Sequence, residues 1–154
     1  ASLKHVKLLS DKEINQIVCL SGDEALKIDF VADLYLKNIL AFVVPSPPSF
    51  GAVPQELLAL NVPVYCTDPV SISDDPLQRD TPIGLALSIA NELGFNVMLA
   101  GFDGYRDHGN KAAQIMTAEA EEILQLNQNR YPETGIQSIT PTHYAVAKTS
   151  VYAI

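Results

Sequence analysis

The residues able to do chemistry gather in this sequence where short apolar runs end. Ser21-Gly22-Asp23, Pro45-Ser46-Pro47-Pro48 and Thr67-Asp68 each follow such a run, and Gly101 to Tyr105 follows a fourth. If these runs are parallel strands, the segments lie at the carboxyl edge of a sheet, where open α/β sheets bind their ligands. The sequence therefore predicts a binding site assembled from loop amides, hydroxyls and carboxylates.

The hydroxyl groups near these segments have two interpretations. Together with the amides of a helix N-terminus, the hydroxyls of Ser21 and Thr81 are suited to receive phosphate or carboxylate, and Gly22 allows close backbone approach. Alternatively, Ser21, Asp23 and Thr81 are helix caps that only complete backbone hydrogen bonds. Both interpretations stay open.

The segment Gly101-Phe102-Asp103-Gly104-Tyr105 combines a carboxylate with a phenol hydroxyl. Asp103 is suited to bind a ligand hydroxyl, and Tyr105 offers a neutral donor to a phosphate or leaving-group oxygen. The structural alternative is that Asp103 holds its own loop while Tyr105 packs on the sheet edge. His143 is a candidate general base if the C-terminal strands bring it to this site, and otherwise an exposed loop histidine.

Signatures of the common nucleotide, hydrolase and metal sites are missing. The sequence contains no G-x-G-x-x-G, G-x-x-x-x-G-K-[ST], G-x-S-x-G or H-E-x-x-H. The histidines and cysteines are not spaced as metal ligands are in known metal-binding motifs. The one local cluster of acidic residues and histidine is formed by Asp103, Asp107 and His108, and it is typical of a surface loop. We therefore expect no metal site here, and no cofactor other than a nucleotide or nucleotide-sugar ligand.

Strand and helix patterns alternate along the chain. Apolar runs bounded by turn residues predict strands at residues 15–20, 39–44, 63–66, 96–100, 137–139 and 147–152. Amphipathic stretches predict helices at residues 23–37, 54–60, 82–93 and 111–126. Thr81 caps the third of these helices and Gly94 closes it. The alternation implies βαβ crossovers, so we expect a single α/β domain over residues 1–154, with a three-layer Rossmann-like fold and a mostly parallel sheet covered by helices on both faces.

Composition narrows the classes of partner. The 154 residues are 47% hydrophobic and 18% charged, which excludes disorder and supplies enough apolar bulk for a core. The net charge is −8, and neither a basic stripe nor an apolar run of membrane-spanning length occurs, so we expect no nucleic-acid or membrane partner. Cys19 and Cys66 lie in predicted buried strands, which indicates reduced core thiols and a cytoplasmic location. The chain begins at Ala1 without a methionine, so we expect either a processed product or a fragment of a longer protein.

One stretch of the sequence resembles a known family. The helix from Thr81 to Gly94 and the following Asn96 to Tyr105 resemble the small-residue helix, Leu-Gly turn and Gly-x-Asp-x-Tyr strand end of bacterial CMP-sialic-acid sialyltransferases and of hydroxymethylpterin-diphosphokinase-like domains. This resemblance implies that Ser21-Gly22-Asp23 approaches a nucleotide and that Tyr105 lies near its phosphate. It also makes His143 the counterpart of the catalytic histidine of the transferases.

A second resemblance accounts for the missing methionine. Gly101 to Tyr105, the glutamate-rich helix and Ser138 to Pro141 resemble the carboxyl-terminal part of HMGL-like aldolases. Those proteins are related to 4-hydroxy-2-oxovalerate aldolase and carry a metal-dependent TIM barrel ahead of such a tail. The metal motif of the barrel is not in this chain, so the resemblance implies that aldolase chemistry, and any divalent metal, belong to the parent barrel.

Three functions are consistent with these patterns. The first is an accessory ligand-binding domain of an HMGL-like aldolase or lyase, whose partners are a nucleotide or nucleotide-sugar and the N-terminal barrel of the parent chain. The second is a glycosyltransferase of the sialyltransferase-like type that uses a CMP-sugar donor. The third is a structural interaction module, and homo-oligomer formation stays open for all three.

Overall fold

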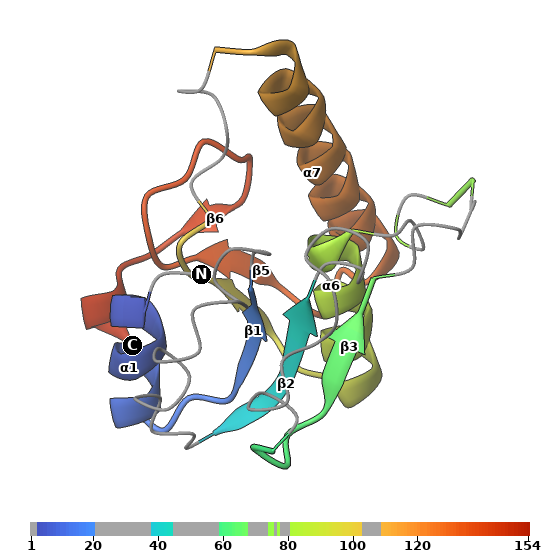
Figure 1. The fold of residues 1–154 in the computed structure, drawn as a ribbon. Coiled ribbons are helices and arrows are strands. Elements are labelled where there is room, and N and C mark those ends of the chain that lie inside the picture. Colours follow the sequence, from blue (N-terminus) through green and yellow to red (C-terminus); the bar gives the residue numbers. More distant parts are fainter. Residues whose placement is uncertain are drawn as a thin grey trace. The chain divides into compact units, whose positions relative to one another are not determined.

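The computed structural model describes residues 3–20, 38–44, 59–67, 74–75, 77, 81–102 and 109–154 (Figure 1). The chain divides into two compact units. The first unit contains Ala1–Ile72 and Asp80–Ala86, and the second contains Ser73–Arg79 and Leu87–Ile154.

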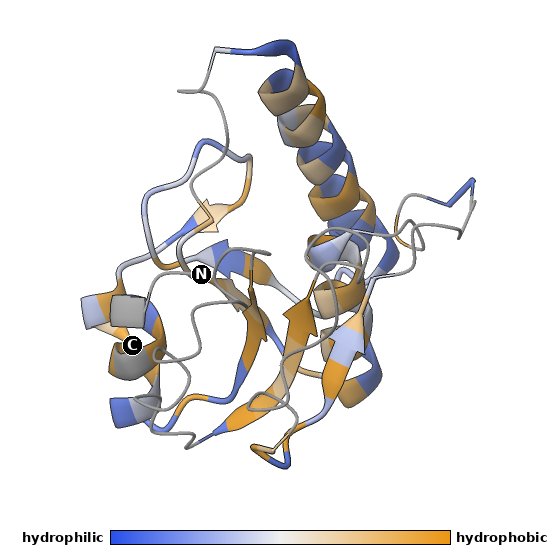
Figure 2. Ribbon diagram, in the orientation of Figure 1, coloured by the Kyte–Doolittle hydropathy of each residue, from blue (hydrophilic) through white to orange (hydrophobic). Residues whose placement is uncertain are grey.

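The first unit is built on a parallel three-stranded sheet. Its strands are β1 (Gln16–Cys19), β2 (Ile39–Val44) and β3 (Val64–Cys66), in the spatial order β1-β2-β3. The central strand β2 is apolar along its whole length and almost entirely buried, as expected for a strand covered on both faces (Figure 2). The three strands predicted at residues 15–20, 39–44 and 63–66 are thereby confirmed.

Helix α1 (Leu3–Asp11) packs against β1 and was not expected from the sequence. The buried amide of Gln16 joins the two elements, because its Nε2 donates to the carbonyl oxygen of Val6 at 3.2 Å and to Ser10 Oγ at 2.9 Å. The apolar core of the unit consists of Val6, Val18, Leu20, Ile39, Phe42 and Val44.

Helix α6 (Pro82–Leu93) has the bounds that its end signals predict. Thr81 Oγ1 accepts a hydrogen bond from the Gly84 amide at 3.2 Å, which is the N-cap interaction, and Pro82 occupies the first helical position. Gly94 has φ +70°, the left-handed conformation that ends helices. The boundary between the two units falls inside this continuous helix, after Ala86.

The second unit has a parallel sheet of its own, in the order β4-β5-β6. Its strands are β4 (Val97–Leu99), β5 (Ile136–Ser138) and β6 (Ala147–Lys148). The strands predicted at residues 96–100 and 137–139 are confirmed. The strand predicted at 147–152 is wrong beyond Lys148, because Ser150 caps a 3₁₀ turn at Val151–Ala153.

Helix α7 (Lys111–Arg130) is one turn longer than predicted. The side chain of Asn110 accepts from the Ala113 amide at 2.7 Å and starts the helix. Polar and apolar residues alternate around its surface, and one face is buried (Figure 2). The buried residues are Ala113, Thr117, Ala120, Ile123, Leu124 and Asn127.

The mixed α/β class and the parallel pairing are therefore confirmed, while the described strands form two sheets rather than one. The three-layer arrangement and the single domain stay predictions. The predicted helix at 23–37 lies outside the described residues. So does most of the predicted helix at 54–60, of which Ala59 and Leu60 form a turn. Within the described part of the chain, no helix is both long and apolar enough to cross a membrane.

Candidate functional site

The carboxyl ends of β1, β2 and β3 share one edge of the first sheet. Cys19 is paired with Val43 and Val44 with Cys66, so the strands end level with one another. Thr67 follows β3 directly, is buried, and donates its amide to the Val44 carbonyl at 3.1 Å. The other residues predicted for this edge, Ser21, Gly22, Asp23 and Ser46, lie outside the described residues.

The N-terminus of α6 lies at the same edge. Cys19 Sγ donates a hydrogen bond to the carbonyl oxygen of Pro82 at 3.9 Å, so the first turn of α6 lies beside the carboxyl end of β1. Thr81 could belong to the predicted site only if its helix begins beside this edge, and the helix does begin there. Thr81 also caps the helix, and Pro82 has no amide hydrogen. The first turn therefore offers an anion fewer amides than an uncapped helix N-terminus does.

Gly101 belongs to the second unit and has a structural role there. Its φ is +68°, and its amide donates to Thr140 Oγ1 at 2.9 Å. The hydroxyl of Thr142 donates to the Phe102 carbonyl at 2.7 Å, and the rings of Phe102 and Tyr144 lie 5.0 Å apart. These contacts hold the β5–β6 connection against the end of β4. Asp103 and Tyr105, the other predicted residues of this segment, lie outside the described residues.

His143 is exposed on the β5–β6 connection of the second unit, between the buried residues Thr142 and Tyr144. No described side chain forms a hydrogen bond or ion pair with His143, whereas a general base is normally oriented by a partner. The interpretation as an exposed loop histidine describes this environment best.

The two cysteines have different environments. Burial raises the pKa of the Cys19 thiol from 9.0 to about 11, because the thiolate is poorly solvated there. The two cysteines were both predicted to be buried. Cys19 is partly buried, and the prediction is wrong for Cys66, which is exposed on β3, an edge strand of the described sheet. Neither cysteine forms a disulfide, and the described residues contain no group of three potential metal ligands.

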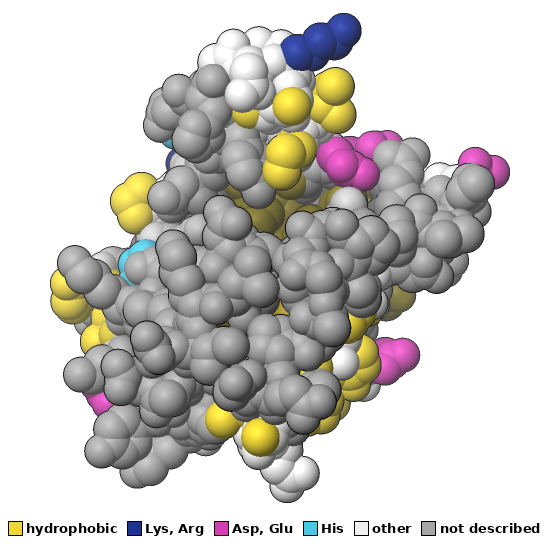
Figure 3. Space-filling view, viewed as in Figure 1, with side chains coloured by type: hydrophobic (Ala, Val, Ile, Leu, Met, Phe, Trp, Pro, Cys, Tyr) yellow, Lys and Arg dark blue, Asp and Glu magenta, His cyan; other side chains and the backbone are white. Residues whose placement is uncertain are grey.

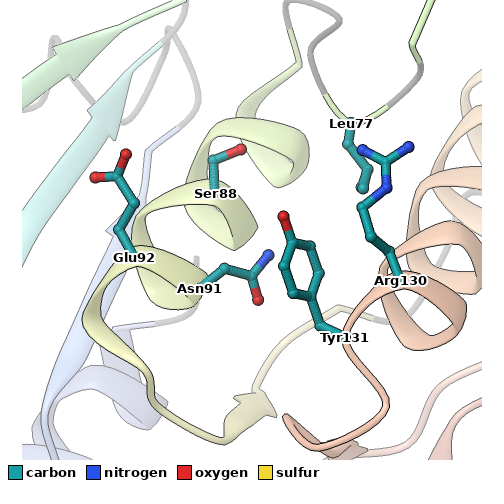
Figure 4. A pocket seen from close by; sticks show the side chains of 6 residues that line it. All are labelled: Leu77, Ser88, Asn91, Glu92, Arg130 and Tyr131. Atoms are coloured by element: carbon teal, nitrogen blue, oxygen red, sulfur yellow. The ribbon is translucent and has the colours of Figure 1, made fainter.

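A pocket in the second unit was not predicted. Its volume is about 290 Å³, and Figure 4 shows side chains from α6 facing Tyr131 at the end of α7. The lining residues are Leu77, Ser88, Asn91, Glu92, Arg130 and Tyr131. Ser88, Asn91 and Glu92 are spaced i, i+3, i+4, which puts them on one helical face; this was the available sequence signal. Their partners are distant in sequence, so that signal alone defined no pocket.

An ion pair organises one wall of this pocket. Arg130 Nη1 donates to Asp75 Oδ2 at 2.8 Å and Nη2 to Asp75 Oδ1 at 3.4 Å, while the Leu77 amide donates to Asp75 Oδ1 at 3.1 Å. The hydrogen bond from Arg130, followed by that from Leu77, lowers the pKa of Asp75, and the same pair raises the pKa of Arg130. One carboxylate therefore positions both Leu77 and Arg130.

A hydrogen bond between two asparagine side chains joins α6 to α7 on the side of the pocket that α6 forms. Asn91 Nδ2 donates to Asn127 Oδ1 at 2.7 Å, and Asn127 is fully buried. The other two amide atoms, Asn91 Oδ1 and Asn127 Nδ2, have no hydrogen-bond partner among the described residues. Both atoms are closed to solvent, so the contact between α6 and α7 leaves two buried polar atoms unpaired among the described residues, which is uncommon in folded proteins.

Comparisons of the chain with protein-family models, with curated proteins and with solved structures find no match. The resemblances to sialyltransferase-like domains and to HMGL-like aldolases therefore depend on the sequence segments quoted above.

Proposed function

We propose that this chain is a ligand-binding α/β domain of the three-layer Rossmann-like type, and that its ligand is a nucleotide or nucleotide-sugar. The ligand lies beyond the carboxyl ends of β1, β2 and β3, beside the N-terminus of α6. The observation that carries the proposal is the hydrogen bond from Cys19 to Pro82, which brings a helix N-terminus to the carboxyl edge of a parallel sheet. Such an edge attracts the phosphate of a nucleotide.

The phosphate is recognised by backbone amides and hydroxyls rather than by basic side chains. On the face in Figure 3, the described Lys and Arg side chains form no cluster, and the net charge of the chain is −8. A site of this kind gains its selectivity from directed hydrogen bonds at short range. Thr67 at the end of β3 and Thr81 at the start of α6 are the described side chains placed to contribute.

The proposal extends to the parent protein. The chain is the accessory domain of an HMGL-like aldolase or lyase, and the N-terminal barrel of that protein is its partner. The support comes from the sequence at Gly101 to Tyr105 and Ser138 to Pro141. Aldolase chemistry and its divalent metal then reside in the barrel, while this domain binds the ligand.

The alternative of a glycosyltransferase assigns catalysis to His143. The binding role is favoured, because His143 is exposed and no described side chain orients it. A transferase hydrolyses its CMP-sugar donor slowly without an acceptor, and this hydrolysis disappears in His143→Ala. Donor turnover by the unmodified chain, lost in that variant, would replace the binding proposal with the transferase.

Calorimetric titration with CMP, a CMP-sugar and cytidine tests the binding proposal. We expect CMP to bind about tenfold more tightly than cytidine, because a phosphate held by amides and hydroxyls adds charge-assisted hydrogen bonds. Thr67→Ala and Thr81→Ala should each weaken CMP binding by about tenfold. Thr81→Ser, which keeps the hydroxyl, should bind CMP normally.

Thr149→Ala is the matched control, because Thr149 lies in the second unit after β6. Its affinity for CMP should equal that of the unmodified chain. Equal affinities for CMP and cytidine, or an equal loss in Thr149→Ala and Thr67→Ala, would refute the sheet-edge site. A thermal melt of each variant identifies any loss of binding that is caused by unfolding.

A further inference from the structure

Helix α7 is joined to the rest of the second unit by an asparagine pair, a short apolar stripe and an exposed ion pair. We propose that α7 is a detachable element of the fold. It separates from α6 at the contact between Asn91 and Asn127 and unwinds, while the sheet of β4, β5 and β6 stays folded. This conformational device is independent of the sheet-edge site proposed above.

The asparagine pair is a costly contact between the two helices. Its one hydrogen bond, from Asn91 Nδ2 to Asn127 Oδ1, is 2.7 Å long. The remaining amide atoms, Asn91 Oδ1 and Asn127 Nδ2, are closed to solvent and have no hydrogen-bond partner among the described residues. Water would bind both atoms if the helices parted, so the free energy lost in desolvating them is regained on opening.

The apolar stripe of α7 is short for a helix of 20 residues. Only two of the buried residues of α7 are large and apolar, Ile123 and Leu124. The buried residues before them are small or polar, and the next buried position of the same face is Asn127. Because hydrophobic stabilisation grows with the apolar area removed from water, this stripe holds α7 weakly.

The C-terminal end of α7 is fastened by an ion pair at the surface. The side chains of Arg130 and Asp75 are 44% and 25% exposed, and ion pairs in contact with water contribute little to stability. The pocket of about 290 Å³ lies beside this end, with Asn91 of α6 and Tyr131 among its lining residues (Figure 4). The surfaces that face the pocket lack the dispersion contacts of a packed helix interface.

Separation from α6 also removes what keeps α7 helical, because helices in proteins owe most of their stability to packing. The amides of Ile123 and Leu124 then exchange with solvent through this local opening. The amides of Val97 and Ile139 behave differently, since their hydrogen bonds of 3.0 Å join the ends of β4 and β5. These two amides exchange only when the sheet itself unfolds.

Hydrogen exchange of the folded protein, followed residue by residue with NMR, tests whether α7 opens on its own. Ile139→Val removes one methylene from a buried residue at the end of β5. We expect it to speed exchange of the Val97 amide by about fivefold, because it weakens the sheet. Exchange at Ile123 and Leu124 should be unchanged, because opening of α7 leaves the sheet intact. Equal acceleration at all three amides would mean that α7 opens only when the whole unit unfolds, and would overturn the proposal.

The double variant Asn91→Leu/Asn127→Leu tests whether the asparagine pair is the weak point. Leucine has nearly the shape of asparagine and needs no hydrogen-bond partner, so exchange at Ile123 and Leu124 should slow by about tenfold. Asn129→Leu makes the same change at an exposed position of α7 and is the matched control. It should slow exchange by no more than about twofold, through helix propensity alone. Equal rates in the double variant and the control, or faster exchange in the double variant than in the unmodified chain, would refute the role of the pair.

Discussion

Cys19 and Cys66 end two strands of one sheet, yet their surroundings give them different chemistry. Cys19 donates to the Pro82 carbonyl, and burial raises its thiol pKa to about 11. Cys66 is exposed on β3. Because the thiolate is the reactive form, the raised pKa of Cys19 should make it react with thiol reagents more slowly than the exposed Cys66.

The raised pKa of Cys19 predicts a loss of stability in alkaline solution. Above pH 9.0 the unfolded chain releases the thiol proton, whereas the folded chain keeps it until about pH 11. The stabilisation is thus complete below pH 9.0 and is lost as pH rises toward about 11. The free energy of unfolding should fall by about 2 kcal/mol between about pH 8 and pH 10.5 through this group.

Urea unfolding at both pH values checks this expectation. The fall should be about 2 kcal/mol smaller in Cys19→Ala than in the unmodified chain, because other groups that titrate in this range are common to both. Cys66→Ala should keep the full fall. An identical pH dependence in all three proteins would show that the Cys19 thiol is not buried.

Individual site residues were predictable where their role depends on their own neighbours. Thr81 was recognised as a hydroxyl at a helix start, and its capping interpretation is confirmed, since its Oγ1 accepts from the Gly84 amide. Its role toward a ligand stays a prediction. Asn91, Asn127 and Tyr131 were not predicted, because the role of an asparagine or tyrosine side chain depends on its contacts in the folded protein. These contacts come from a helix 36 residues away in the case of the Asn91–Asn127 bond.

At the scale of elements, local signals determined the ends of α6. A threonine and a proline at its start and a glycine after its end act through adjacent backbone groups, and the bounds were predicted to the residue. The last strand shows the limit of such patterns. The apolar alternation at 147–152 predicted an extended strand, but Ser150 bonds to the Tyr152 amide and turns the chain into a 3₁₀ helix.

The end of α6 should be sensitive to replacement of Gly94. Its φ of +70° is unfavourable for any residue with a Cβ, while a Cβ built there meets nothing within 4 Å. Gly94→Ala should therefore lower the free energy of unfolding by about 1 kcal/mol through backbone strain alone. Gly135 also has open space around a built Cβ, and its φ is not in the left-handed region.

Gly135→Ala is thus the matched control for strain at Gly94. We expect it to be neutral or to stabilise the protein by about 0.5 kcal/mol, since alanine restricts the unfolded chain. Denaturant titrations of the two variants measure the difference. Equal stabilities would mean that Gly94 ends the helix without strain, and that another contact decides where α6 stops.

At the scale of the whole molecule, strand pairing was the part that the sequence could not supply. Parallel strands have the same apolar composition whichever neighbour they choose, so alternation predicted one sheet where the described strands form two. The connection between β5 and β6 illustrates the difficulty. Two parallel neighbours are joined there without a helix, and their connection contains the buried residues Thr142 and Tyr144.

Helix α6 is shared by both units, and we therefore expect the two units to unfold together. Its residues up to Ala86 belong to the first unit and those from Leu87 to the second. Helical hydrogen bonds join each amide to the carbonyl four residues earlier, so they cross this boundary. Neither half is long enough to remain helical alone, and the loss of one unit therefore removes an element from the other.

Ile39→Val and Ile123→Val test this coupling with the same chemical change in each unit. Both side chains are buried, and each substitution should cost about 1 kcal/mol. If the units unfold together, calorimetry gives one transition, and either variant lowers its midpoint by about 3 °C. Two transitions, each moved by only one of the substitutions, would instead define two domains and contradict the single domain predicted for residues 1–154.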